Sequence, residues 1–153
     1  PPRPLPLEAA VMSEPACVLC ERVAGEGEHF IADLDACRAY FNPDQFFPGW
    51  VFVGLRWHAR EVYALSRAER ARVVEDVSWM ARALAQVYQP VKMNYELLGN
   101  QVAHIHWHLV PRLAGDPEPQ WPVWRVQHEP STLPADEVAA RIEAIRRALG
   151  APR

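Results

Sequence analysis

Long apolar runs are missing from this sequence of 153 residues. A membrane-spanning helix needs about 18 or more consecutive apolar residues, so the sequence predicts no such helix and no membrane partner. The proline-rich opening from Pro1 to Pro6 lacks the apolar core of a signal peptide, and we interpret residues 1–12 as an extended leader. We therefore expect the protein to be cytoplasmic.

Positive charge is also scarce. The sequence has 16 Lys and Arg residues against 19 Asp and Glu residues, which gives a formal net charge of -3. Proteins that hold the phosphate backbone of duplex nucleic acid use a basic stripe, so no binding to duplex nucleic acid is expected. A small anionic ligand is not excluded, because a local pocket needs no global charge.

Cysteine is sparse as well. The chain has three cysteines, an odd number, and two of them form the motif Cys17-Val18-Leu19-Cys20. An odd count does not suit a framework of structural disulfides, whereas a C-x-x-C pair in a reduced compartment favours metal binding or redox chemistry. The cysteine pattern therefore agrees with a cytoplasmic location.

The length and the apolar half of the residues suit one domain that spans 1–153 and buries its own core. A helix over 67–88 is the clearest element, because the capping-box pattern Ser66-Arg67-Ala68-Glu69 precedes apolar residues at helical spacing. The bulky run at 50–55 predicts a central strand. The pattern as a whole predicts an α+β fold with a largely antiparallel sheet. Further strands are expected at 30–34, 37–41, 92–97 and 103–110, and further helices within 7–24 and over 135–149.

Three histidines alternate with apolar residues in the last of these strands: His104, His106 and His108. Side chains alternate between the faces of a strand, so the three imidazoles are expected on one face, about 6.6 Å from one to the next. Their positive charges would repel one another, so at least one stays neutral at pH 7. A neutral imidazole can act as a metal ligand, a general base or a nucleophile. A triad that chelates a catalytic metal ion, or that only packs, is an alternative at this point.

The segment from Lys92 to Arg112 resembles the histidine triad (HIT) family of nucleotide hydrolases and transferases. The signature of that family is three histidines alternating with apolar residues, followed by apolar residues and often by Pro-Arg. The resemblance implies a HIT-like fold, with a five-stranded sheet, one long helix and short terminal helices, and it implies a homodimer. It extends over roughly residues 17–112, through the motifs Cys17-x-x-Cys20, Cys37-Arg38-Ala39-Tyr40-Phe41-Asn42, Pro48-Gly49 and Arg56-Trp57-His58.

The resemblance also implies roles for individual residues. His106 would attack the α-phosphorus of a purine nucleotide and form a nucleotidyl-imidazole that water hydrolyses. His108 would contact the phosphate or the leaving group. The implied substrate is a dinucleoside polyphosphate or a nucleoside phosphoramidate. The expected nucleotide-binding residues, whose polar members could equally serve ordinary turns, are Leu19, Asn42, Asn94, Asn100 and Gln101.

A structural zinc ion is implied by the same resemblance. Part of the family holds zinc through two N-terminal cysteines, a histidine after the Pro-Gly strand and the first histidine of the triad. The matching residues are Cys17, Cys20, His58 and His104, a set that suits tetrahedral zinc with no open position. Such an ion would remove His104 from catalysis and fix the strand that carries His106.

The sequence departs from the family pattern in three places. Trp50 follows Pro-Gly where the family often has histidine, and Asn42 stands where an acidic residue commonly holds the ribose. Gly99-Asn100-Gln101 replaces the more usual Gly-Gln-Ser/Thr. These departures motivate a second hypothesis, a zinc-stabilised nucleotide-binding protein with little turnover.

Overall fold

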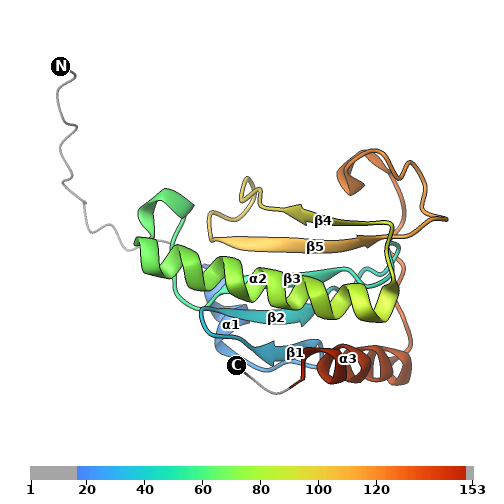
Figure 1. Cartoon of the computed structure of the whole chain (residues 1–153), viewed down its shortest axis with the longest axis horizontal. Coiled ribbons are helices and arrows are strands. Elements are labelled where there is room, and N and C mark those ends of the chain that lie inside the picture. Colours follow the sequence, from blue (N-terminus) through green and yellow to red (C-terminus); the bar gives the residue numbers. More distant parts are fainter. Residues whose placement is uncertain (1–16, 151–153) are drawn as a thin grey trace.

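One five-stranded sheet forms the centre of the computed structural model, which describes residues 17–150 (Figure 1). The strand order is β1-β2-β3-β5-β4, and every neighbouring pair is antiparallel. The expected leader 1–12 and the first part of the expected helix within 7–24 lie outside the described residues. The elements are α1 (Val18–Ala24), β1 (Phe30–Asp33), β2 (Cys37–Phe41), β3 (Val51–Leu55), η1 (Val62–Ala64), α2 (Arg67–Tyr88), β4 (Lys92–Glu96), β5 (His106–Arg112), η2 (Val123–Arg125) and α3 (Ala135–Leu149).

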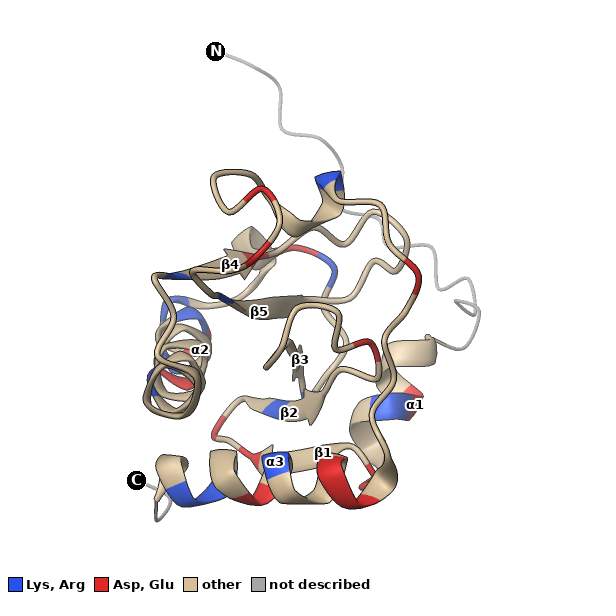
Figure 2. Cartoon of the chain, turned by 90° about the vertical axis from the view of Figure 1, so that its right-hand side faces the viewer, with Lys and Arg blue, Asp and Glu red and all other residues tan. Residues whose placement is uncertain are grey.

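Helices α2 and α3 pack on one face of the sheet and bury the main core there (Figure 1). Alternate residues of β2 and β3, such as Phe41 and Val53, enter this core, because successive side chains of a strand point to opposite faces. The residues between them, such as Tyr40 and Phe52, form a second cluster with Leu19 of α1. The face opposite α2 also carries His106 and His108, whose rings lie beside that of Phe52. Acidic and basic residues are interspersed along α3 (Figure 2).

The capping box at the start of α2 is present as the sequence predicts. The Glu69 amide donates to the Ser66 hydroxyl at 3.2 Å, and the Ser66 amide donates to the Glu69 carboxylate at 2.7 Å. At the other end, Gln89 adopts the left-handed conformation with φ 48° and Pro90 follows. These signals explain why the predicted bounds of this helix are confirmed.

Gly49 sets the turn that leads into β3. Its φ is +84°, and a Cβ atom there would lie 2.6 Å from the ring of Tyr88 at the end of α2. Only glycine accepts both the conformation and the close contact without strain. The end of α2 and the start of β3 are thus held together, which places Trp50 at the edge of the face opposite the helices.

The predicted bounds of β2 and α3 are also confirmed, and β1, β3 and β4 are each one residue shorter than expected. The predicted strand over 103–110 is wrong at both ends, because β5 starts at His106 and ends at Arg112. The backbone turns before it: the His104 amide donates to the Val102 carbonyl at 2.8 Å, and the Ile105 amide donates to Ala59. Only His106 and His108 therefore follow the strand alternation.

The short helices η1 and η2 were not expected from the sequence. Each is a single turn of three residues, too short to give an apolar periodicity. Within residues 17–150, no helix is long and apolar enough to cross a membrane.

Candidate functional site

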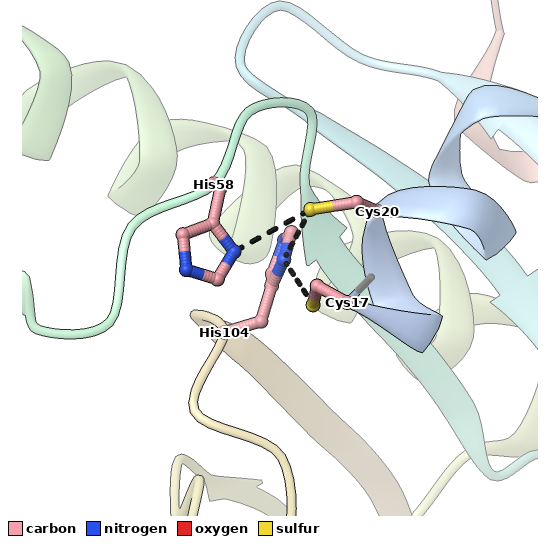
Figure 3. A group of neighbouring side chains, drawn as sticks. All are labelled: Cys17, Cys20, His58 and His104. Atoms are coloured by element: carbon pink, nitrogen blue, oxygen red, sulfur yellow. Dashed lines mark hydrogen bonds between the residues drawn. The ribbon is translucent and has the colours of Figure 1, made fainter. Parts of the chain in front are cut away.

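Two groups of side chains meet around the start of β5, and the second of them contains His106 and His108. The first, which we call the metal group, consists of Cys17, Cys20, His58 and His104. These side chains converge from α1, from the loop after β3 and from the segment before β5 (Figure 3). Their potential ligand atoms all lie within 4.8 Å of one another. Residues 87 positions apart in the sequence thus form one compact cluster.

The spacing of the metal group suits a tetrahedral zinc ion. The Cys20 sulfur lies 3.4 Å from Nδ1 of His58 and 3.4 Å from Nδ1 of His104, and the Cys17 sulfur lies 3.5 Å from Nδ1 of His104. Zinc bonds to sulfur at about 2.3 Å and to nitrogen at about 2.0–2.1 Å, so the sulfur–nitrogen edge of its tetrahedron is about 3.5 Å. Two thiolates and two imidazoles are also a common ligand set for structural zinc. The residues present are compatible with zinc in both chemistry and spacing.

A backbone hydrogen bond orients the buried His104 ring. Its Nε2–H donates to the carbonyl oxygen of Leu55 at 2.9 Å, because a carbonyl can only accept. The Nδ1 lone pair then points to the two cysteines. Burial lowers the pKa of His104, although the Leu55 hydrogen bond opposes this effect. The ring is therefore neutral and carries its lone pair on the side of the metal group.

The backbone of His104 in turn orients His106. Nδ1 of His106 lies 2.6 Å from the His104 carbonyl oxygen, so this nitrogen carries the proton and donates it. The lone pair of the His106 ring is therefore on Nε2. His106 is only 8% exposed, and its ring lies 5.3 Å from that of Phe52. An imidazole whose Nδ1–H is held in place, and whose Nε2 carries the lone pair, is suited to attack an electrophile.

His108 has the opposite tautomer. The indole Nε1–H of Trp50 donates to Nδ1 of His108 at 3.1 Å, which leaves the His108 proton on Nε2. Burial, together with the neighbouring His106 and Arg22, lowers the pKa of His108 to about 4. At neutral pH His108 is therefore an uncharged hydrogen-bond donor, 5.2 Å from the ring of His106.

Aromatic rings surround the catalytic candidates His106 and His108, and Arg22 lies over one of these rings. Trp124 contacts both Trp50 and His108, with ring centroids 5.3 and 5.1 Å apart. The guanidinium carbon of Arg22 lies 4.7 Å from the centre of the Phe52 ring. Our sequence interpretation named Trp50 only as a departure and missed Arg22. A signal was available, because Arg22 lies between Leu19 and Val23, on the side by which α1 packs on the sheet.

A family model described as the HIT domain matches residues 25–115, more than half of the chain. The chain belongs to the HIT family.

Two solved structures with the same fold and one further protein are similar to this HIT protein. A histidine triad protein from Bradyrhizobium japonicum is 31% identical, with a TM-score of 0.72 over 80% of this chain and 92% of that chain. "Protein hit" of Bacillus subtilis (strain 168) is 28% identical over 109 residues, which is 63% of this chain and 70% of that protein. A zinc-bound histidine triad family protein from Mycobacterium smegmatis is 20% identical, with a TM-score of 0.67 over 88% and 93% of the two chains.

The Pro-Arg end of the HIT signature has a structural role in this chain. The Arg112 guanidinium is fully buried and donates to the Asp116 carboxylate at 3.0 Å and to the Trp121 carbonyl at 2.6 Å. It lies 5.0 Å from the centre of the Phe47 ring. Arg112 thus holds the loop that leads to Trp124, and through that loop it shapes the surroundings of His108.

The expected nucleotide-binding residues are only partly brought to the triad. Leu19 of α1 packs against Tyr40 and Phe52 on the triad face. Asn42 donates to the Asp44 carbonyl at 3.0 Å, which is a turn contact, and Asn94 accepts from Arg112 at 3.1 Å. Asn100 and Gln101 are exposed in the loop between β4 and β5.

We predict that His108 stays neutral throughout the range in which a histidine ordinarily titrates. Because its pKa is lowered to about 4, proton uptake requires more acidic solution than its usual value of 6.5. NMR titration of the imidazole nitrogens from about pH 8 to pH 5 should therefore leave the His108 signals unchanged. His128 provides an internal reference: partial desolvation lowers its pKa, but the hydrogen bonds to Asp44 and Val126 outweigh this and raise it. A His108 midpoint near its ordinary value would contradict this prediction.

Proposed function

We propose that this HIT protein is a nucleotide hydrolase that acts at the α-phosphate of a purine nucleotide conjugate. The substrate is a dinucleoside polyphosphate or a nucleoside phosphoramidate. One observation carries the proposal: the His104 carbonyl fixes the tautomer of His106 and leaves its Nε2 lone pair available. A ring that only packed in a core would not need this arrangement beside the neutral His108. Membership of a family whose members bind and hydrolyse nucleotides supports the same reaction class.

The proposed reaction has two displacements at phosphorus. Nε2 of His106 attacks the α-phosphorus, the bond to the leaving group breaks, and its electron pair departs with that group. The His106 ring is then positively charged, and its Nδ1–H remains bonded to the His104 carbonyl. Water attacks the same phosphorus, the electron pair of the phosphorus–nitrogen bond returns to Nε2, and a proton passes to the solvent. The Nε2–H of His108 donates to the oxygens on which negative charge develops.

We assign the remaining candidates to nucleotide binding. Leu19, which packs against Tyr40 and Phe52 on the triad face, is assigned to the side of the site that holds the base. Among the described residues, none is hydrogen-bonded to Oδ1 of Asn42 or Nδ2 of Asn94, so these atoms are assigned to the ribose and phosphate. Asn100 and Gln101 precede β5 and would donate to phosphate oxygens.

Replacement of the nucleophile tests the proposed reaction. His106→Ala should lower kcat at least about a thousandfold on diadenosine polyphosphates and adenosine phosphoramidate, because the covalent route is lost. Mass spectrometry of the acid-quenched protein should show a nucleotidyl adduct on the unaltered chain and none on the variant. His29→Ala is the matched control. His29 precedes β1, which is separated by β2 and β3 from β5, the strand that carries His106.

Activity that survives His106→Ala undiminished would contradict this mechanism. Nucleotide binding by calorimetry, with neither turnover nor adduct in the unaltered protein, would instead favour the second hypothesis of a binding protein with little turnover.

We also propose that the metal group holds zinc. The ion would be structural, because four protein ligands leave it no open position for substrate. It would join α1 to the segments that precede α2 and β5, and so hold Leu19 and His106 in place. Cys17, Cys20, His58 and His104 would be its ligands, as their spacing and chemistry support.

We predict about one zinc per chain by elemental analysis, and a loss of most of it in Cys17→Ala. The same variant should unfold at a lower temperature, because metal binding contributes to folding free energy. Cys37→Ala is the control, since Cys37 is buried in the core under α2 and lies outside the metal group. Full zinc retention in Cys17→Ala would mean that the ion is held elsewhere, for example by the triad itself.

The homodimer and the cytoplasmic location stay predictions. Strand β4 is the outermost strand on its side of the sheet. Its residue Tyr95 (51% exposed) and Leu98 just after it (57% exposed) offer an apolar surface along this edge. A second copy could cover such an edge by strand pairing.

A further inference from the structure

We propose that this site selects conjugates whose leaving group departs as a phosphate anion, and that Trp50 and Arg22 are the residues that determine this choice. The inference rests on the proposed function and narrows it: phosphoanhydride conjugates such as dinucleoside polyphosphates are substrates, and phosphoramidates are poor ones. Two independent observations carry it, the hydrogen bond from Trp50 to His108 and an arginine without an acidic partner beside the triad.

Trp50 prevents His108 from acting as a proton donor of ordinary strength. An imidazolium has a proton on both nitrogens, so a charged His108 would place Nδ1–H against the indole N–H that lies 3.1 Å away. The Trp50 ring is buried and packs against Phe47 and Trp124, so it cannot easily turn aside. His108 is thus kept as the neutral Nε2–H tautomer by geometry.

Two of the groups that face His108 add to this effect. His106 precedes it on the same face of β5, and Arg22 approaches from α1; both oppose a positive charge on His108. Phe52 of β3 and Trp124 are uncharged. Glu96 of β4 is paired with His108 in the sheet, and its carboxylate accepts from the Val123 amide.

The leaving group decides whether a neutral donor is enough. When a phosphoanhydride is cleaved, the bridging oxygen keeps the electron pair and departs as a phosphate anion, which needs only hydrogen bonds and a cation. When a phosphoramidate is cleaved, the departing nitrogen must take up a proton as the phosphorus–nitrogen bond breaks. His108 could supply that proton only by becoming an imidazolate anion. General acid catalysis of this step contributes about 10²–10⁴-fold where it operates, and this site withholds it.

Arg22 supplies the cation that an anionic leaving group needs. Its guanidinium carbon lies 4.7 Å from the centre of the Phe52 ring and 5.4 Å from that of Tyr40, so two aromatic rings hold it on the triad face. Within residues 17–150, no carboxylate forms an ion pair with it and no group accepts a hydrogen bond from it. Burial lowers the pKa of Arg22, but a guanidinium stays charged at neutral pH. Its donors are thus available to a phosphate.

The test compares two substrates of the unaltered full chain: diadenosine tetraphosphate, which releases ATP through its anionic terminal phosphate, and adenosine 5′-phosphoramidate, which releases ammonia. We expect kcat/KM for the first to exceed that for the second by at least about a hundredfold at neutral pH. Equal rates, or a preference for the phosphoramidate, would overturn this inference and leave the proposed function standing. Hydrolysis of neither substrate would overturn both.

Two variants separate the contributions. Trp50→Phe removes the indole donor, so the pKa of His108 measured by NMR should rise, and the preference should fall about tenfold or more at about pH 6 because the phosphoramidate gains. Trp79→Phe is the matched control: it removes an indole N–H that donates to the Leu149 carbonyl at 3.1 Å. The Trp79→Phe variant should keep the same preference for diadenosine tetraphosphate over the phosphoramidate. An unchanged preference in Trp50→Phe, with His108 titrating normally, would overturn the role of Trp50.

Arg22→Leu should lower kcat/KM for diadenosine tetraphosphate about a hundredfold and affect the phosphoramidate much less. Arg38→Leu is its control, because Arg38 also lies over an aromatic ring, that of Phe30, but is already paired with Asp33. Equal losses for both substrates in Arg22→Leu would overturn the role of Arg22 in leaving-group choice.

Discussion

The hydrogen bond from Nδ1 of His106 to the backbone carbonyl of His104 links the two halves of this site. The same residue offers its ring to the metal group and its carbonyl to the candidate nucleophile. A shift of His104 would therefore disturb both the cysteine-containing cluster and the tautomer of His106. The second hydrogen bond of His104, to Leu55, ties this pair to the end of β3. The catalytic geometry consequently depends on how the backbone turns just before β5.

Trp50 changes the chemistry of the triad by changing one proton position. A histidine at this place could either donate or accept, and could share a proton with His108. An indole can only donate, so His108 has a fixed and neutral role. The buried aromatic surroundings strengthen this effect, because low polarity disfavours charge. The site thus acts through fixed dipoles and one arginine, and is suited to leaving groups that already carry their charge.

Much of the fold could be predicted from the sequence, because its signals are local. The capping box and Pro90 mark α2, and the elements 37–41 and 135–149 have clear apolar patterns. The start of β5 could not be predicted, since alternation continues through His104 while the backbone has already left the strand. Its direction there depends on a hydrogen bond between Ile105 and Ala59, which are 46 positions apart in the numbering.

The site was predictable in its members more than in its contacts. The metal group followed from the resemblance, and the structure brings its four members together. The partners of Trp50 and Arg22 depend on the register of β3 with β5 and on the packing of α1, which no local pattern records. Asn42 and Asn94 were predicted only as ligand-binding residues, but each also has a contact within the protein.

The tautomers of the three histidines are the central claim of this account. A long-range proton–nitrogen NMR correlation of the imidazole rings at about pH 7, on the full chain, observes them directly. The account predicts the proton on Nδ1 of His106 and on Nε2 of both His104 and His108. A proton on Nε2 of His106 would contradict it, because Nε2 would then have no lone pair with which to attack phosphorus.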